Sequence, residues 1–206
     1  MSFPERGVRV SWSFWLLVVF AAVASPTVIV LSVFLAAALH ECGHLLMLRI
    51  FRVNVEGLRL SALGAVLYAR GTQRLSYGRE LAVTLAGPAV NLLFGFLTAL
   101  CSLRLGWVDG FVFAGAHLLL AAFNLLPVPP LDGSRALYLA VSFFFGPMAG
   151  DTVTAVTGTL FSLALSGAAL WLHLETGAGL FFLLAALALL FGALEQLRLA
   201  KRAAKV

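Results

Sequence analysis

The sequence predicts an all-α polytopic membrane protein with about six transmembrane helices. Of its 206 residues, 62% are hydrophobic and only 11% are charged, a composition too apolar for a soluble domain. The apolar residues occur in runs long enough to cross a bilayer, and most Lys and Arg residues fall between these runs. We therefore expect a single membrane-embedded domain over residues 1–206, with its core motifs in 28–133 and no soluble accessory domain.

The basic residues indicate an orientation in the membrane and do not indicate nucleic-acid binding. The chain has 14 Lys and Arg residues against 9 Asp and Glu residues, for a net charge of +5. They are spread along the chain, from Arg6 to Lys205, instead of forming one basic patch. If both termini are cytoplasmic, only Arg104 lies outside, as the positive-inside rule requires. We expect this topology in a bacterial cytoplasmic membrane.

The first apolar segment runs from Ser11 to Ala24 and has two interpretations. Ala22-Val23-Ala24 after a basic start resembles a signal-peptide cleavage site, whereas Pro26 directly beyond it disfavours cleavage. The second span, Val28 to Ile50, is about 34 Å long at the helical rise, enough to cross a bilayer. Whether or not the first segment is retained, this second span begins outside.

The connection from Phe51 to Glu80 is the longest polar segment, and a small β-hairpin is expected within it. Val53-Asn54-Val55 and Leu58-Arg59-Leu60 alternate apolar and polar residues, and glycines punctuate the run. Such a hairpin could hold an extended substrate by main-chain hydrogen bonds along a strand edge. An ordinary basic loop at the membrane surface is an equal alternative.

The later spans contain residues that are costly in lipid. The third, Leu81 to Leu103, includes Pro88 and Asn91, and the Asn91 amide needs a polar partner inside the protein. A helix-packing contact and a catalytic role for Asn91 both fit. The fourth span, Phe111 to Leu126, breaks at three prolines between residues 127 and 130. Two further spans are expected at 153–174 and 178–197.

Two histidines and a carboxylate in the second span predict a metal site. His40 and His44 are four residues apart, so they share one face of a helix, and Glu41 lies beside them. This H-E-x-x-H pattern supplies two imidazoles for zinc and a carboxylate that takes a proton from water. Ionisable groups at membrane depth mark functional sites, which favours zinc binding over a packing role.

A carboxylate after the broken fourth span could complete this site. Apolar sequence resumes at Ala136, so Asp132 is expected at membrane depth on irregular backbone. A carboxylate there needs a cation, and zinc is the obvious one. A surface turn at Asp132-Gly133 is the alternative.

The three motifs together resemble the site-2 protease family of intramembrane zinc metalloproteases. The resemblance covers about residues 8–145 and rests on the H-E-x-x-H pattern, on Gly87-Pro88 with Asn91, and on 124–133 with its Asp132-Gly133 pair. The compact form is similar to the sporulation type that processes a sigma-factor precursor. A nucleotide-sensing CBS domain is not expected, because only residues 198–206 follow the last predicted span.

The resemblance implies a role for each matching residue. His40, His44 and Asp132 would bind one Zn²⁺ per chain, and Glu41 would be the general base and acid. Asn124 and Asn91 would hold substrate or stabilise the oxyanion. The substrate would be a transmembrane or membrane-tethered protein such as a sigma-factor precursor or anti-sigma factor, and an inhibitory membrane partner would fit the same family.

Two other functions are compatible with membrane-embedded ionisable residues. An ion or small-molecule transporter could use them with broken helices, although internal repeats, which such folds favour, are not evident. A non-catalytic membrane protein that binds partners is expected to have lost Glu41 or a ligand, and here all are present. The sequence therefore favours the protease.

Overall fold

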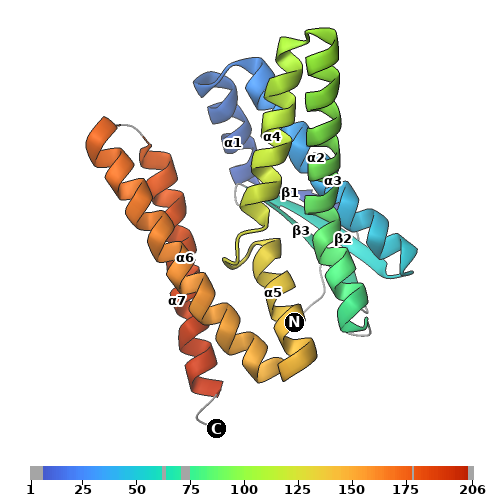
Figure 1. Ribbon diagram of the computed structural model, residues 1–206, viewed down its shortest axis with the longest axis vertical. Helices are drawn as coiled ribbons and strands as arrows, with labels where there is room; N and C mark the ends of the chain where they lie inside the picture. Colours follow the sequence, from blue (N-terminus) through green and yellow to red (C-terminus); the bar gives the residue numbers. More distant parts are fainter. Residues whose placement is uncertain (1–6, 62–63, 71–74, 178, 204–206) are drawn as a thin grey trace. The chain divides into compact units, whose positions relative to one another are not determined.

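A computed structural model of the chain describes residues 7–61, 64–70, 75–177 and 179–203 (Figure 1). Arg6, Arg74 and Lys205, among the basic residues considered above, lie outside the described residues. The chain divides into two compact units, Met1–Ala122 and Phe123–Val206, and each is described by itself. The helices are α1 (Trp12–Ala24), α2 (Thr27–Ile50), α3 (Tyr77–Leu105), α4 (Val108–Asn124), α5 (Asp132–Phe145), α6 (Pro147–Thr176) and α7 (Leu180–Ala203). The strands are β1 (Gly7–Val10), β2 (Asn54–Ser61) and β3 (Gly64–Arg70).

Helices α2 and α3 form the centre of the first unit and pack closely because the residues between them are small. On α2 the buried face consists of Ser32, Ala36, His40, Gly43 and Leu48. On α3 it consists of Thr84, Gly87, Pro88, Asn91, Gly95 and Ser102. Helices in lipid associate through such small and polar faces, because apolar side chains gain little by leaving lipid for protein. The same faces carry the polar residues that the sequence singled out.

Helix α4 packs its own small stripe against α3. Its buried residues are Gly110, Ala114, His117 and Ala121. A side chain at Gly95 on α3 would run into Leu118 of α4, so this glycine lets the two helices approach. The turn between the helices is made by Gly106, whose φ of 67° is a left-handed conformation suited to glycine.

The predicted hairpin is confirmed, and it belongs to a larger sheet. Strands β2 and β3 pair antiparallel, with Leu58 opposite Leu67 and Leu60 opposite Ala65. Strand β1, which was not predicted, pairs parallel with β2 and gives the order β1-β2-β3. Strand β1 has only four residues, all exposed, and its Val8-Arg9-Val10 alternation is too short a run to identify a strand. Strands β1 and β3 are therefore the two edges of this sheet.

The second unit is a helical hairpin with a shorter helix at its start. The buried residues Gly150, Thr154, Gly158, Ser162 and Ser166 recur every fourth position on α6, so they form one stripe. Gly158 faces Pro129 of the segment before α5, and Gly150 faces Ser142 of α5. Gly146, with φ of 86°, separates α5 from α6, so α6 begins at Pro147, before the expected start of that span at residue 153. Pro147 can open α6 because a first-turn residue needs no N–H partner.

The helices are those of an integral membrane protein. Within the described residues, four helices are long and apolar enough to cross a membrane, and α1 and α4 are shorter apolar helices. Their outward faces carry exposed large apolar side chains such as Leu31, Leu97, Phe161 and Phe191. Soluble proteins do not expose apolar surface on this scale, whereas lipid covers it at no cost. The predicted all-α membrane fold with a small β element is confirmed.

Candidate metal centre

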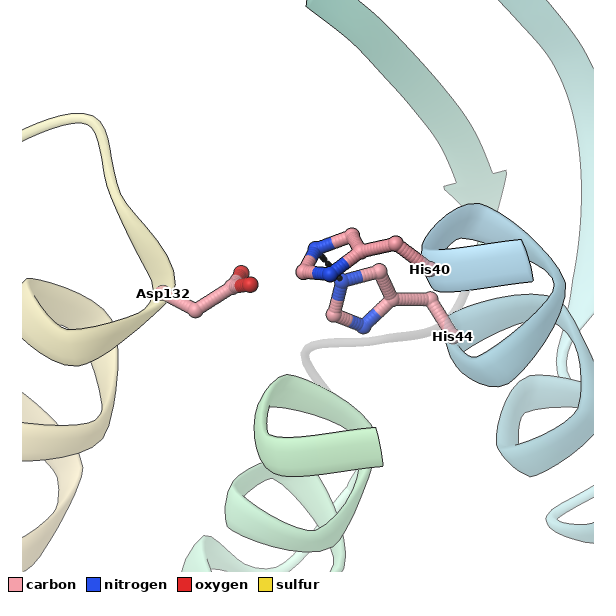
Figure 2. Close-up of side chains that lie close together, drawn as sticks. All are labelled: His40, His44 and Asp132. Carbon is pink, nitrogen blue, oxygen red and sulfur yellow. Dashed lines mark hydrogen bonds between the residues drawn. The ribbon is translucent and has the colours of Figure 1, made fainter. Parts of the chain in front are cut away.

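The two histidines of α2 meet at one point. His40 is 5% exposed, and its Nε2 atom lies 3.1 Å from Nε2 of His44, with the two rings nearly perpendicular (Figure 2). Two ligands of a tetrahedral zinc, each about 2.0–2.1 Å from the metal, lie roughly 3.3 Å apart. The spacing of these two atoms therefore fits one edge of a tetrahedral zinc site.

Glycines make room for the two imidazoles between α2 and α3. A Cβ atom at Gly87 of α3 would lie 2.7 Å from Nε2 of His40 and would also run into Nε2 of His44. A Cβ atom at Gly43 of α2 would lie 2.6 Å from the backbone oxygen of Ala86. Gly43 thus allows the helices to approach, and Gly87 leaves space directly beside the two nitrogen atoms.

The outer nitrogen atoms of both histidines are hydrogen-bonded to α3. Nδ1 of His44 donates to the carbonyl oxygen of Val83 at 2.8 Å, which leaves the lone pair on its Nε2. That tautomer is the one that binds zinc through Nε2. Nδ1 of His40 lies 3.1 Å from Nδ2 of Asn91, whose side chain is completely buried. This contact orients the ring of His40, although an amide N–H group here faces the nitrogen atom through which a metal-binding histidine usually donates.

A third histidine, His117 of α4, joins this hydrogen-bonded chain. Its Nδ1 atom lies 2.9 Å from Oδ1 of Asn91, and the side chain is completely buried. Its ring lies between Phe94, which stacks on it at 5.9 Å, and Phe113, which meets it edge-on at 4.4 Å. His117 was not among the predicted site residues, because no metal-ligand spacing surrounds it. Its position as a histidine within an apolar helix was the available signal.

The remaining predicted site residues are Asp132, Glu41 and Asn124. Asp132 is the first residue of α5, in the second unit, and Figure 2 draws its side chain with those of His40 and His44. These three residues supply two imidazoles and one carboxylate, a donor set that suits zinc. Glu41 follows His40 on α2 and is half-buried, and Asn124 is the last residue of α4.

The irregular segment before Asp132 has the break that its prolines predict. Residues 125–131 are not α-helical, and helix α5 begins at Asp132. A Cβ atom at Gly133 would run into the backbone of Leu125 and Leu126, so the segment folds tightly back onto the start of α5. Glycine after the aspartate is required by this close approach.

The fold is that of a known protein. The chain matches the solved structure of a site-2 protease from Methanocaldococcus jannaschii with a TM-score of 0.67 and 22% sequence identity, over 96% of this chain and 94% of that one. The chain has the site-2 protease fold. The fold that this resemblance implied is thereby confirmed.

Curated proteins of similar sequence are named as zinc metalloproteases. A zinc metalloprotease of Methanocaldococcus jannaschii is 28% identical over 143 residues, which are 67% of this chain and 41% of the relative. Rip3 of Mycobacterium tuberculosis, which also carries the name zinc metalloprotease, is 32% identical over 141 residues, 62% of this chain and 34% of that protein. The chain thus spans less than half the length of these curated relatives. No family model matches it.

Proposed function

We propose that this protein is a zinc-dependent intramembrane endopeptidase. The observation that carries the proposal is the pair of Nε2 atoms of His40 and His44, spaced as tetrahedral zinc ligands on an apolar helix of the site-2 protease fold. Similarity to proteins named zinc metalloproteases supports both the metal and the reaction. Buried imidazoles at this depth need a function to justify their cost.

The ligand set is completed by Asp132. Two imidazoles and one carboxylate leave a tetrahedral zinc one open position, as catalytic zinc sites require. The two nitrogen ligands have the backbone of Val83 and the Asn91 amide behind them, so their rings are held in place. One Zn²⁺ per chain follows from this single set.

The chain's own residues perform the proton transfers of peptide hydrolysis. Bound zinc supplies a Lewis acid and an acidified water molecule. Glu41 accepts the proton of the attacking water and delivers it to the leaving amine. Asn124 donates a hydrogen bond to the peptide oxygen as that oxygen gains negative charge. The Asn91 amide serves the histidines instead, because both its ends are engaged by them.

The substrate is a transmembrane or membrane-tethered protein that is locally unwound before cleavage. A helix keeps its carbonyl groups in internal hydrogen bonds, so the cut segment must be extended. Strand β3 is an edge of the sheet and could pair with such a segment by main-chain hydrogen bonds. With both termini in the cytoplasm, as the basic residues indicate, this edge lies on the cytoplasmic side of a bacterial membrane. An inhibitory membrane partner would act by covering the same edge.

Replacing Asp132 with alanine tests both the ligand set and the proposed function. We expect the wild-type protein to hold one zinc per chain and to cleave a membrane-tethered test substrate. Asp132→Ala should weaken zinc binding by more than about 100-fold, beyond the usual cost of losing an outer hydrogen-bond partner, and should abolish cleavage. Zinc is measured by elemental analysis and by competition with a chelator.

The matched control is Asp109→Asn, which removes a carboxylate from the first turn of α4. This variant should bind zinc and cleave as the wild type does. Wild-type protein that holds no zinc would disprove the metalloprotease, whereas an Asp132→Ala variant with unchanged zinc affinity would remove Asp132 alone from the ligand set.

A further inference from the structure

A continuous chain of hydrogen bonds joins three histidines in the first unit, across helices α2, α3 and α4. In the structure His117 donates through Nδ1 to Oδ1 of Asn91, and Nδ2 of Asn91 donates to Nδ1 of His40. Neutral His40 then carries its proton on Nε2, which donates to Nε2 of His44. His44 donates in turn to Val83. Every bond in the chain points the same way, from His117 toward Val83.

Zinc binding requires the hydrogen bond between Asn91 and His40 to run in the opposite direction, with His40 as the donor. A histidine that binds zinc through Nε2 must present a lone pair there and carry its proton on Nδ1. His44 already has this tautomer, because the carbonyl of Val83 can only accept. His40 has the opposite one, because the Nδ2 group of Asn91 can only donate.

A half-turn of the Asn91 side-chain amide resolves this conflict without breaking the chain. The oxygen and nitrogen atoms of an amide are nearly the same size, so the rotated group occupies the same space. Oδ1 of Asn91 then accepts from Nδ1 of His40, and Nδ2 donates to Nδ1 of His117. The proton of His40 moves from Nε2 to Nδ1, that of His117 from Nδ1 to Nε2, and no proton is gained or lost.

His117 is suited to this exchange because its other nitrogen atom is unconstrained. Nε2 of His117 is buried and has no hydrogen-bond partner among the described residues, so no neighbouring hydrogen-bonding group fixes whether it carries a proton. The tautomer of His117 is therefore set by Asn91 alone. A side chain that could only donate at this position would hold the amide in the orientation that opposes zinc binding.

We propose that His117 is a positioning residue for the metal site, acting through Asn91 to place the proton of His40 on Nδ1 and so to free Nε2 for zinc. This rests on the proposed function, since it takes His40 as a zinc ligand. It goes beyond the proposed function by assigning a role to His117 of α4, a residue that does not contact the metal. Outer partners of metal-binding histidines change metal affinity by about 10–100-fold, so the effect is large enough to measure.

Two substitutions of His117 separate hydrogen bonding from packing. His117→Phe keeps an aromatic ring between Phe94 and Phe113 but offers Asn91 no partner, and we expect it to bind zinc about 10–100-fold more weakly. His117→Asn places an amide atom where Nδ1 stood, and it can accept or donate, so zinc affinity should return to within a few-fold of wild type. His173→Phe, on α6, removes a histidine elsewhere and should change nothing.

The tautomers themselves can be observed. Imidazole ¹⁵N shifts of the wild-type protein, with zinc and after its removal by a chelator, should show His117 changing from the Nδ1–H to the Nε2–H form as zinc binds. Cobalt substitution should give a tetrahedral visible spectrum in the wild type and His117→Asn, and a weaker one in His117→Phe. Helical circular dichroism should be equal in all variants.

Several results would overturn the inference. These are an unchanged zinc affinity in His117→Phe, an equal loss in the Phe and Asn variants, and a His117 tautomer that ignores zinc. Each leaves the proposed function standing, because it concerns His117 alone. Failure of the proposed function looks different, since the wild-type protein would then hold no zinc and His44→Ala would bind as much metal as wild type.

Discussion

Glu41→Gln should keep one zinc per chain and lose cleavage by about 10²–10⁴-fold, the contribution of a general acid–base group. Glutamine has nearly the shape of glutamate but cannot accept a proton from the attacking water. Because Glu41 is not among the three ligands, the zinc content is expected to stay the same. The measurement pairs elemental analysis of the purified variant with cleavage of a membrane-tethered substrate.

The control for this variant comes from the next residue of the same helix. Cys42 lies exposed on α2, so Cys42→Ala should retain both zinc and cleavage. A Glu41→Gln variant that cuts as fast as wild type would show that another group transfers the proton. Loss of zinc together with cleavage would instead make Glu41 part of the metal site.

The fold could be predicted largely from composition and from runs of apolar residues. Length and hydropathy located every described helix except α5, and Pro and Gly residues located most of the breaks between them. The boundary before α6 was harder, because Gly146 alone ends one helix and allows the next to begin at Pro147. Strand β1 was missed because its pairing with β2 joins segments more than forty residues apart, and because its Val8-Arg9-Val10 alternation is too short to identify a strand.

In the site, as in the fold, relations within one helix could be predicted from the sequence and contacts between helices could not. His40 and His44 could be paired because a helix fixes the relation between positions four apart. The contacts of Asn91 with His40 and His117 could not, since they depend on which faces of α2, α3 and α4 meet. The sequence indicated only that an intramembrane amide needs partners. Gly87 could be recognised as part of a motif. Why this position must be glycine is clear only from the structure, in which the two histidines lie beside it.

Gly87→Ala should have the largest effect on metal binding of any single methyl group added to the first unit. Its Cβ atom would occupy the space beside both Nε2 atoms, so the imidazoles must leave the positions that match a zinc site. The added methyl group would displace only the ring ends of His40 and His44, so the helices can stay in place. We expect zinc affinity to fall by at least about 100-fold, more than the loss of an outer partner costs, and cleavage to fall with it.

Two other glycines make this prediction specific. Gly78→Ala, on the same helix α3, adds a methyl group that meets nothing within 4 Å, so it should keep both zinc binding and thermal stability. Gly43→Ala presses instead on the backbone of Ala86, which cannot move without separating α2 from α3. It should lower the thermal unfolding temperature, whereas Gly87→Ala should leave it nearly unchanged. Full zinc affinity in Gly87→Ala would mean that the metal does not lie between α2 and α3, and the placement of the site would fail.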